Sequence, residues 1–210
     1  MNELIEKLRQ PDFPVLFNFN NLKNLKINNN FKKLFEESIN NKWINKIYKD
    51  LYTLSYDYCK SYVSLEVIAQ MIVPESYISS AYVLSINNWI PERVYFITSI
   101  AKNIDMDIDT NEYMSYSYTK LYKNYISYGI TEKENECGKY KIAKPLRALC
   151  DYILKRNDDC SCFEYFTDYM RIDFDKFEKL TCNDFDELQG KFNIKKIENM
   201  LENIRKELKL

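Results

Sequence analysis

The sequence contains no histidine among its 210 residues and only three glycines. Without histidine, the chain cannot build a Ser-His or Cys-His nucleophilic pair, a histidine-ligated metal centre or a histidine general base. The isolated glycines Gly129, Gly138 and Gly190 cannot form a phosphate-binding or dinucleotide-binding loop. No other catalytic motif accompanies these absences, so the sequence favours a protein that is not an enzyme.

Long hydrophobic runs are also absent. The longest near-apolar run, at 67–73, is far shorter than the ~20 residues that span a bilayer. The N-terminal residues carry charges of both signs where a secretory signal has an apolar core. We therefore predict a cytoplasmic protein with no membrane partner and with reduced thiols. Cys150, Cys160, Cys162 and Cys182 fit no standard zinc spacing, so we expect thiols packed as small hydrophobes, no bound metal and no cofactor.

The charges of the chain are spread unevenly. Hydrophobic residues make up 46% of the sequence, which excludes wholesale disorder, and the length allows one or two domains. Residues 1–60 hold ten Lys or Arg against seven Asp or Glu, a net of +3, whereas 61–210 have a net of −4. A basic N-terminal segment on a mildly acidic remainder is typical of a small DNA-binding unit joined to a larger domain.

Residues 1–58 have the pattern of three helices followed by a β-hairpin. Helices are expected over 2–9, after a cap at 20–21 and over 31–40, and alternation over 43–47 and 51–54 predicts paired strands. We predict a winged helix-turn-helix, whose third helix enters the major groove and whose hairpin, the wing, contacts the DNA backbone. The candidate DNA-binding residues are Lys23, Lys26, Asn28, Asn29, Asn30, Lys32, Lys33, Lys42, Lys46 and Lys49.

Two features leave another interpretation of this segment open. The spacing of Lys32 with Glu36, and of Lys33 with Glu37, also fits ion pairs on a solvated helix face, each worth a few tenths of a kcal/mol. Asp50 stands in the expected hairpin turn, where a positive φ favours glycine and where its charge would approach phosphate. A protein-interaction module that does not bind an operator therefore remains the alternative.

Residues 59–210 are expected to form a mixed α/β domain with a helical C-terminal part, so the predicted fold class is α+β. We expect helices at 64–73, 79–88, 145–154, 162–171, 174–180 and 194–208, and strands at 94–100, 104–108, 113–119 and 140–143. Ser79 is expected to cap the second of these helices. The apolar stripe of the last helix is either a partner surface or part of its own core, and we expect the core.

Asp105, Asp107 and Asp109 alternate in a way that a metal-dependent nuclease could use if the three carboxylates converged. On a strand, side chains two residues apart share one face, and here that face is most simply the solvent face. No supporting ligands are identifiable, so we predict no metal site.

Three segments together resemble a known family. They are YISSAYVLSINNWIPER at 77–93 with VYFITSI after it, YKIAKPLRALCDY at 140–152, and WINKIYKDLYTL at 43–54. Their order is similar to that in the AbiEi-type antitoxins of bacterial type IV toxin–antitoxin systems, over roughly residues 15–180. In the third segment, Lys46 and Lys49 stand where the family usually has arginines, and Asp50 replaces a glycine.

The resemblance implies a winged helix-turn-helix domain at 1–58 and an antitoxin domain at 59–210. It implies a transcriptional autorepressor that binds operator double-stranded DNA. It also implies a protein that counters a nucleotidyltransferase-type toxin without a stable complex, in abortive phage infection. An antitoxin surface is expected to include Arg93, Lys141, Arg147 and Asp151, although Leu146 replaces an acid of the family pattern. The alternative for Arg147 and Asp151 is a local ion pair of little energetic value.

Overall fold

The computed structural model describes residues 2–25, 27, 30–59, 61–110, 113–121, 127–156, 160 and 162–210. Its elements are α1 (Glu3–Leu8), β1 (Leu16–Phe17), α2 (Phe19–Lys23), α3 (Phe31–Asn40), β2 (Ile44–Tyr48), β3 (Leu51–Leu54), α4 (Leu65–Ile72), β4 (Ser76–Ile78), α5 (Ser80–Ile86), β5 (Phe96–Ala101), β6 (Met106–Ile108), β7 (Ser115–Lys120), β8 (Ile130–Asn135), β9 (Gly138–Ala143), α6 (Pro145–Leu154), the π-helix η1 (Tyr165–Tyr169), α7 (Phe174–Glu178), α8 (Cys182–Asp186) and α9 (Lys195–Glu207). Helices combined with a mixed sheet confirm the α+β class.

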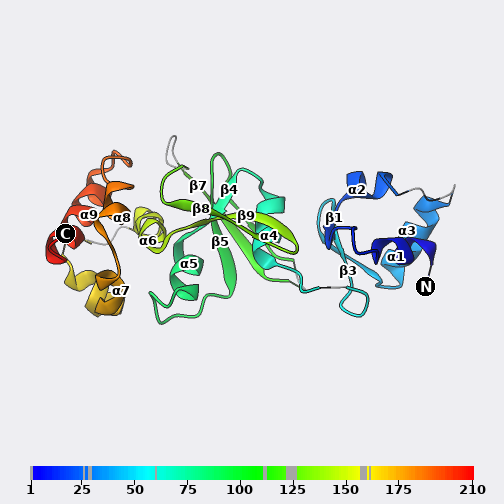
Figure 1. The fold of residues 1–210 in the computed structure, drawn as a ribbon, viewed down its shortest axis with the longest axis horizontal. Helices are drawn as coiled ribbons and strands as arrows, with labels where there is room; N and C mark the ends of the chain where they lie inside the picture. The colour runs from blue at the N-terminus through cyan, green and yellow to red at the C-terminus, as the bar shows by residue number, and fades with distance from the viewer. Residues whose placement is uncertain are drawn as a thin grey trace.

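The first part, α1 to β3, is called the head (residues 2–54), and α4 to α9 the body (residues 65–210). In Figure 1 the head and the C-terminal helices lie at opposite ends of the long axis, with the six-stranded sheet between them. Residues 55–64 connect the two parts. The division at residue 58 that the sequence suggests stays a prediction.

The head consists of three helices and a three-stranded antiparallel sheet in the order β1-β3-β2. The Asn2 side chain accepts a hydrogen bond from the Ile5 N–H, which caps α1, and donates to Ser38 Oγ at 3.0 Å, which ties α1 to α3. Helix α2 begins with a capping box from Asn18 to Asn21, so the cap lies two residues before the expected one. Asn30 holds the cap position of α3 without a side-chain hydrogen bond.

Strand β3 is buried on both faces. Tyr52 and Leu54 pack with the helices of the head, in an apolar cluster drawn from residues 4–59. Leu51 points the other way and joins the apolar core of the body, together with Leu16 and Ile47. Successive side chains of a strand alternate between the faces of its sheet, so a continuous buried run means that both faces are covered. The head is therefore packed against the body through its sheet.

The body is built on a mixed six-stranded sheet in the order β6-β7-β5-β4-β9-β8, in which the pairs β4–β9 and β5–β7 are parallel and the others antiparallel. Tyr118 of β7 donates to the Ala69 carbonyl in α4, whereas Tyr77 of β4 donates to Asp151 in α6. The strand register places these tyrosines on opposite faces of the sheet. Helix α4 therefore covers the face toward the head and α6 covers the other (Figure 1).

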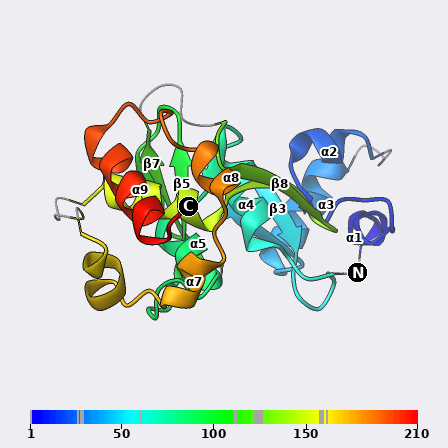
Figure 2. The same cartoon turned by 60° about the vertical axis from the view of Figure 1, so that its left-hand side comes forward.

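The C-terminal helices extend the layer that α6 begins. Figure 1 shows α8 and α9 beside α6, on the side of the sheet away from the head, and Figure 2 shows α7 below α9 and α8. Ile197, Leu201 and Ile204 of α9 are fully buried in the main core, which confirms the core interpretation of this stripe. No helix in the described part of the chain is long and apolar enough to cross a membrane.

Several elements differ from those expected. Strands β1, β4 and β8 and helix α8 were not predicted, and the helix expected at 162–171 is a π-helix over Tyr165–Tyr169. Strand β8 is an edge strand of mostly exposed polar residues. Its sequence therefore lacks the alternation of apolar and polar residues from which a strand is predicted. Of the cysteines, Cys150 and Cys160 pack in the core as expected, whereas Cys162 and Cys182 are exposed.

Candidate functional site

Helix α3 presents a polar surface on the side away from the head's core. Phe35 and Ser38 are buried, and Ser38 Oγ donates to the Leu34 carbonyl at 2.7 Å. Lys32, Lys33, Glu36, Glu37 and Asn40 are all exposed. Of the two lysine–glutamate pairs that the spacing suggests, Lys32 and Glu36 stand 4.0 Å apart with side chains 90% and 62% exposed, and no ion pair of Lys33 occurs among the described residues. The cations of α3 are thus only weakly compensated.

The other candidate DNA-binding residues also lie on the outside of the head. Lys23 is in α2, Lys42 follows α3, Lys46 is in β2 and Lys49 is in the β2–β3 turn, and all four are exposed, as is Asn30. Lys26, Asn28 and Asn29 lie outside the described residues. Lys42 and Lys49 have φ angles of 56° and 39°, in the left-handed region, and Lys49 Nζ lies over the ring of Tyr48.

The geometry at Asp50 corrects one expectation about the hairpin turn. The left-handed residue is Lys49 and not Asp50. Both carboxylate oxygens of Asp50 accept from the Phe19 N–H at the start of α2, at 3.2 and 3.4 Å. This contact places a negative charge at the positive end of a helix and joins the hairpin to α2. Asp50 therefore has a structural partner within the head.

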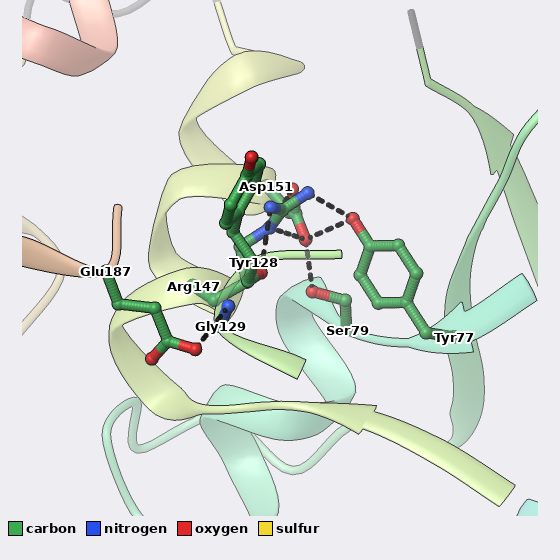
Figure 3. A network of polar contacts seen from close by, with 7 residues as sticks. All are labelled: Tyr77, Ser79, Tyr128, Gly129, Arg147, Asp151 and Glu187. Carbon is green, nitrogen blue, oxygen red and sulfur yellow. Dashed lines mark hydrogen bonds and ion pairs between the residues drawn. The ribbon is translucent and has the colours of Figure 1, made fainter. Parts of the chain in front are cut away.

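A buried polar network lies between the sheet, α6 and the C-terminal helices (Figure 3). Arg147 Nε donates to both oxygens of Asp151 at 3.1 Å, one turn later in α6. Asp151 Oδ2 also accepts from Ser79 Oγ at 2.6 Å and from Tyr77 Oη at 3.0 Å. Arg147 Nη1 donates to the Tyr128 carbonyl at 3.1 Å. The network thus joins α6 to β4, to the start of α5 and to the segment before β8.

Packing encloses the ion pair at the centre of this network completely. The side chains of Arg147 and Asp151 have no exposed surface. The guanidinium group of Arg147 lies 4.8 Å from the ring centroid of Phe192. Beside it, Gly129 N–H donates to Glu187 Oε1 at 3.0 Å, and Lys144 Nζ contacts the other oxygen of Glu187 at 2.6 Å.

The pKa values of Arg147 and Tyr77 in this network are both raised. Burial lowers the pKa of Arg147, but the charge and hydrogen bond of Asp151 together with the neighbouring Tyr77 and Cys150 outweigh burial, and the net shift is upward. Burial, reinforced by the charge of Asp151, raises the pKa of Tyr77 well above its usual value. The arginine therefore remains charged and the tyrosine remains a neutral donor. The described partners of the ion pair belong to β4, to the start of α5 and to the segment before β8, so the arrangement holds these elements of the body together.

The predicted antitoxin surface is wrong for two of its four residues. Arg147 and Asp151 are buried, because Tyr77, Ser79 and the Tyr128 carbonyl surround the ion pair. Only Arg93 and Lys141 are exposed. The small stabilisation expected for an exposed ion pair does not apply to Arg147 and Asp151 either, because both charges are desolvated.

Sequence reasoning missed Tyr77 and Ser79 as members of the network. Ser79 stands at the N-cap position of α5 as expected, but its hydroxyl makes no cap hydrogen bond because it donates to Asp151. No local signal marks these two residues, because Glu75, Ser76 and Ser80 make the segment polar on both sides, and their partner Asp151 lies more than seventy residues later.

The three aspartates considered for metal binding do not form a metal site in the described part of the chain. Asp105, Asp107 and Asp109 are exposed on and around β6, and Asp105 accepts from the Lys120 N–H at 2.8 Å. No group of three or more Cys, Asp or Glu residues in the described ranges is arranged to hold a metal ion.

Comparison with protein-family models finds no family that matches this chain, and comparison with curated proteins finds no match.

Proposed function

We propose that the chain is a DNA-binding regulator of the AbiEi antitoxin kind, a transcriptional autorepressor that counters a nucleotidyltransferase-type toxin. Its head would be a winged helix-turn-helix that places α3 in the major groove and the β2–β3 hairpin on the DNA backbone. The body would carry the antitoxin activity, without chemistry of its own and without a stable toxin complex.

The observation that carries the DNA-binding half is the order of elements in the head. Helix, strand, helix, helix and hairpin follow one another, and β1 pairs with β3 at the edge of a three-stranded sheet. The exposed side of α3 carries Lys32 and Lys33, and the hairpin carries Lys46 and Lys49. Phosphate contacts from such residues supply most of the affinity of non-specific DNA binding. The Phe19 N–H gives the carboxylate of Asp50 a partner within the head.

A second candidate is a protein-interaction module that has the same head but does not bind an operator. The exposed Glu36 and Glu37 on the same helix as Lys32 and Lys33 favour it, because two carboxylates on a recognition helix repel phosphate. A tight protein partner combined with no DNA affinity would support this candidate.

A gel-shift titration of the chain against the DNA upstream of its own gene, at several salt concentrations, tests the proposal. The logarithm of the binding constant should fall linearly with that of the salt concentration, with a slope of about −0.9 per neutralised phosphate. Replacing Lys33 or Lys46 by Ala should reduce the slope by about one each. Lys102→Ala, an exposed lysine of the body after β5, is the matched control and should leave the slope unchanged.

An absent or salt-independent shift would refute the repressor half of the proposal. The antitoxin half is tested separately by co-expression with the nucleotidyltransferase-type protein encoded beside the gene, if one is found there. Growth rescue should survive Lys33→Ala, because in this proposal the head binds DNA and the body opposes the toxin.

A further inference from the structure

A groove of about 810 Å³ opens where the head meets the body. The head contributes Asn45 from β2 and Leu54 from the end of β3, and the body contributes Tyr113 and Met114, just before β7. The connecting segment contributes Tyr62 at the rim. Grooves of ~300–1,000 Å³ at the junction of two structural units are the usual place and size of small-molecule sites.

The lining of the groove is aromatic and uncharged. Tyr56, Tyr62 and Tyr113 supply three rings, and the remaining apolar contacts come from aliphatic and sulfur-containing side chains. Tyr56 and Tyr62 are 93% and 84% exposed, an unusual state for two neighbouring large aromatic residues. No Lys, Arg, Asp or Glu is among the described lining residues.

One polar group marks where a ligand would be oriented. Asn45 Nδ2 donates to Tyr113 Oη at 3.5 Å, a long hydrogen bond across the junction. In the described part of the chain, the Oδ1 atom of the same amide receives no hydrogen bond. An amide oxygen beside tyrosine rings suits a planar molecule that carries an N–H or O–H donor.

We propose that this groove binds an uncharged aromatic small molecule with one hydrogen-bond donor, which stacks against the tyrosines and donates to Asn45. Because the site includes residues of the head, of the body and of the connecting segment, a bound molecule bridges the two parts of the chain. The proposal does not depend on DNA binding, because binding of the small molecule is measured on the protein without DNA.

Saturation-transfer NMR with indole as the probe tests this site on the full chain. Indole is planar and neutral and has a single N–H donor, whereas indole-3-carboxylate carries a charge and benzofuran lacks the donor. Indole should show saturable transfer, with binding about tenfold weaker for either analogue, the loss expected when one hydrogen bond or one desolvated charge is mismatched. Equal binding of all three probes, or no saturable binding of indole, would overturn the proposal.

Variants of the chain test whether indole binds in this groove. Tyr62→Ala removes a ring whose stacking is worth about tenfold in affinity, and Ser61→Trp places an indole ring in the groove that should compete with the probe and weaken its binding. Tyr95→Ala is the matched control, because Tyr95 is also an exposed tyrosine, 68% exposed, but lies outside the groove lining. Circular dichroism verifies that each variant is folded. If Tyr62→Ala converts a dimer into a monomer and indole binding is absent, the surface belongs to a second copy of the chain and the proposal fails.

Discussion

Arg147 and Asp151 form a fully buried ion pair within α6, with Nε 3.1 Å from both carboxylate oxygens. The pair is one helical turn apart in the sequence, but its remaining partners come from Tyr77, Ser79 and Tyr128, more than fifteen residues away. A buried charge that loses its partner has no water to replace it. The integrity of the body therefore depends on both members of the pair.

Removing one member should be far more damaging than removing both. Arg147→Met or Asp151→Leu alone should lower the free energy of unfolding by about 3–5 kcal/mol, because the other charge stays buried and unpaired. The double variant should lose much less than the sum of the two losses, as measured by urea denaturation in a double-mutant cycle. Strictly additive losses would contradict this account. Lys179 and Asp175 have the same spacing but are 72% and 55% exposed, and their removal should change stability by less than about 0.5 kcal/mol.

Gly129 should tolerate no side chain, whereas Gly190 should tolerate one at moderate cost. Both have positive φ angles, 65° and 71°. A Cβ at Gly129 would lie 2.8 Å from Arg147 Cβ and 2.8 Å from Leu188 Cδ2, but a Cβ at Gly190 would meet nothing within 4 Å. Gly190→Ala should therefore cost only the left-handed strain, about 1–2 kcal/mol. Gly129→Ala should cost clearly more in the same urea titration, and equal losses would show that the clash is relieved without cost.

In the α6 region, the sequence predicts the helix and its buried face but not the partners of its buried ion pair. Pro145 at the first turn and the apolar stripe through Leu149 and Ile153 predict the helix and its buried face correctly, because both signals are local. The burial of Arg147 was not predictable in this way, since its partners come from distant strands and loops. The N-cap position of Ser79 was predicted correctly, but the direction of its hydroxyl depends on Asp151, seventy-two residues later.

The same contrast holds in the head. The helices and the hairpin follow from periodicity and asparagine caps, and the structure contains all of them. The two-sided burial of β3 does not follow, because it depends on how the body packs on the sheet. The groove tyrosines have no sequence signal, since only the packing of the head on the body brings Tyr113 beside Asn45.

Tyr116 and Tyr118 of β7 should respond in opposite directions when each loses its hydroxyl. Both are buried, but Tyr118 Oη donates to the Ala69 carbonyl at 2.9 Å, whereas Tyr116 Oη has no partner among the described residues. A buried hydroxyl without a hydrogen bond destabilises the fold. Tyr116→Phe should raise the free energy of unfolding by about 1 kcal/mol and Tyr118→Phe should lower it by about 1 kcal/mol. Changes of the same sign, measured by thermal unfolding, would contradict the hydrogen-bond assignment.

Stability should decline at alkaline pH, and Tyr116→Phe should reduce the decline. Burial raises the pKa of Tyr116 and of Tyr118 above the value of about 10 for an unfolded tyrosine. Above about pH 10 the unfolded chain therefore releases protons that the folded chain keeps, so the stability present below this pH is lost as the pH rises. Urea midpoints at about pH 8 and about pH 11 should differ less in the variant than in the original chain. An unchanged difference would mean that Tyr116 already ionises in the folded state.

At Lys49, in the hairpin turn, the effect of backbone strain can be measured separately from the effect of the side-chain charge. Lys49 has a φ of 39°, in the left-handed region that costs residues other than glycine about 1–2 kcal/mol, and its Nζ lies 5.1 Å from the ring centroid of Tyr48. Lys49→Gly and Lys49→Ala both remove the charge and the ring contact, but only glycine relieves the strain. The glycine variant should therefore be the more stable by about 1 kcal/mol in urea titrations. If Lys49 contacts phosphate, both variants should lose the same amount of salt dependence in the gel shift, a slope change of about one. If the salt dependence instead changes only in the less stable alanine variant, the turn matters for folding of the head and not for contact with DNA.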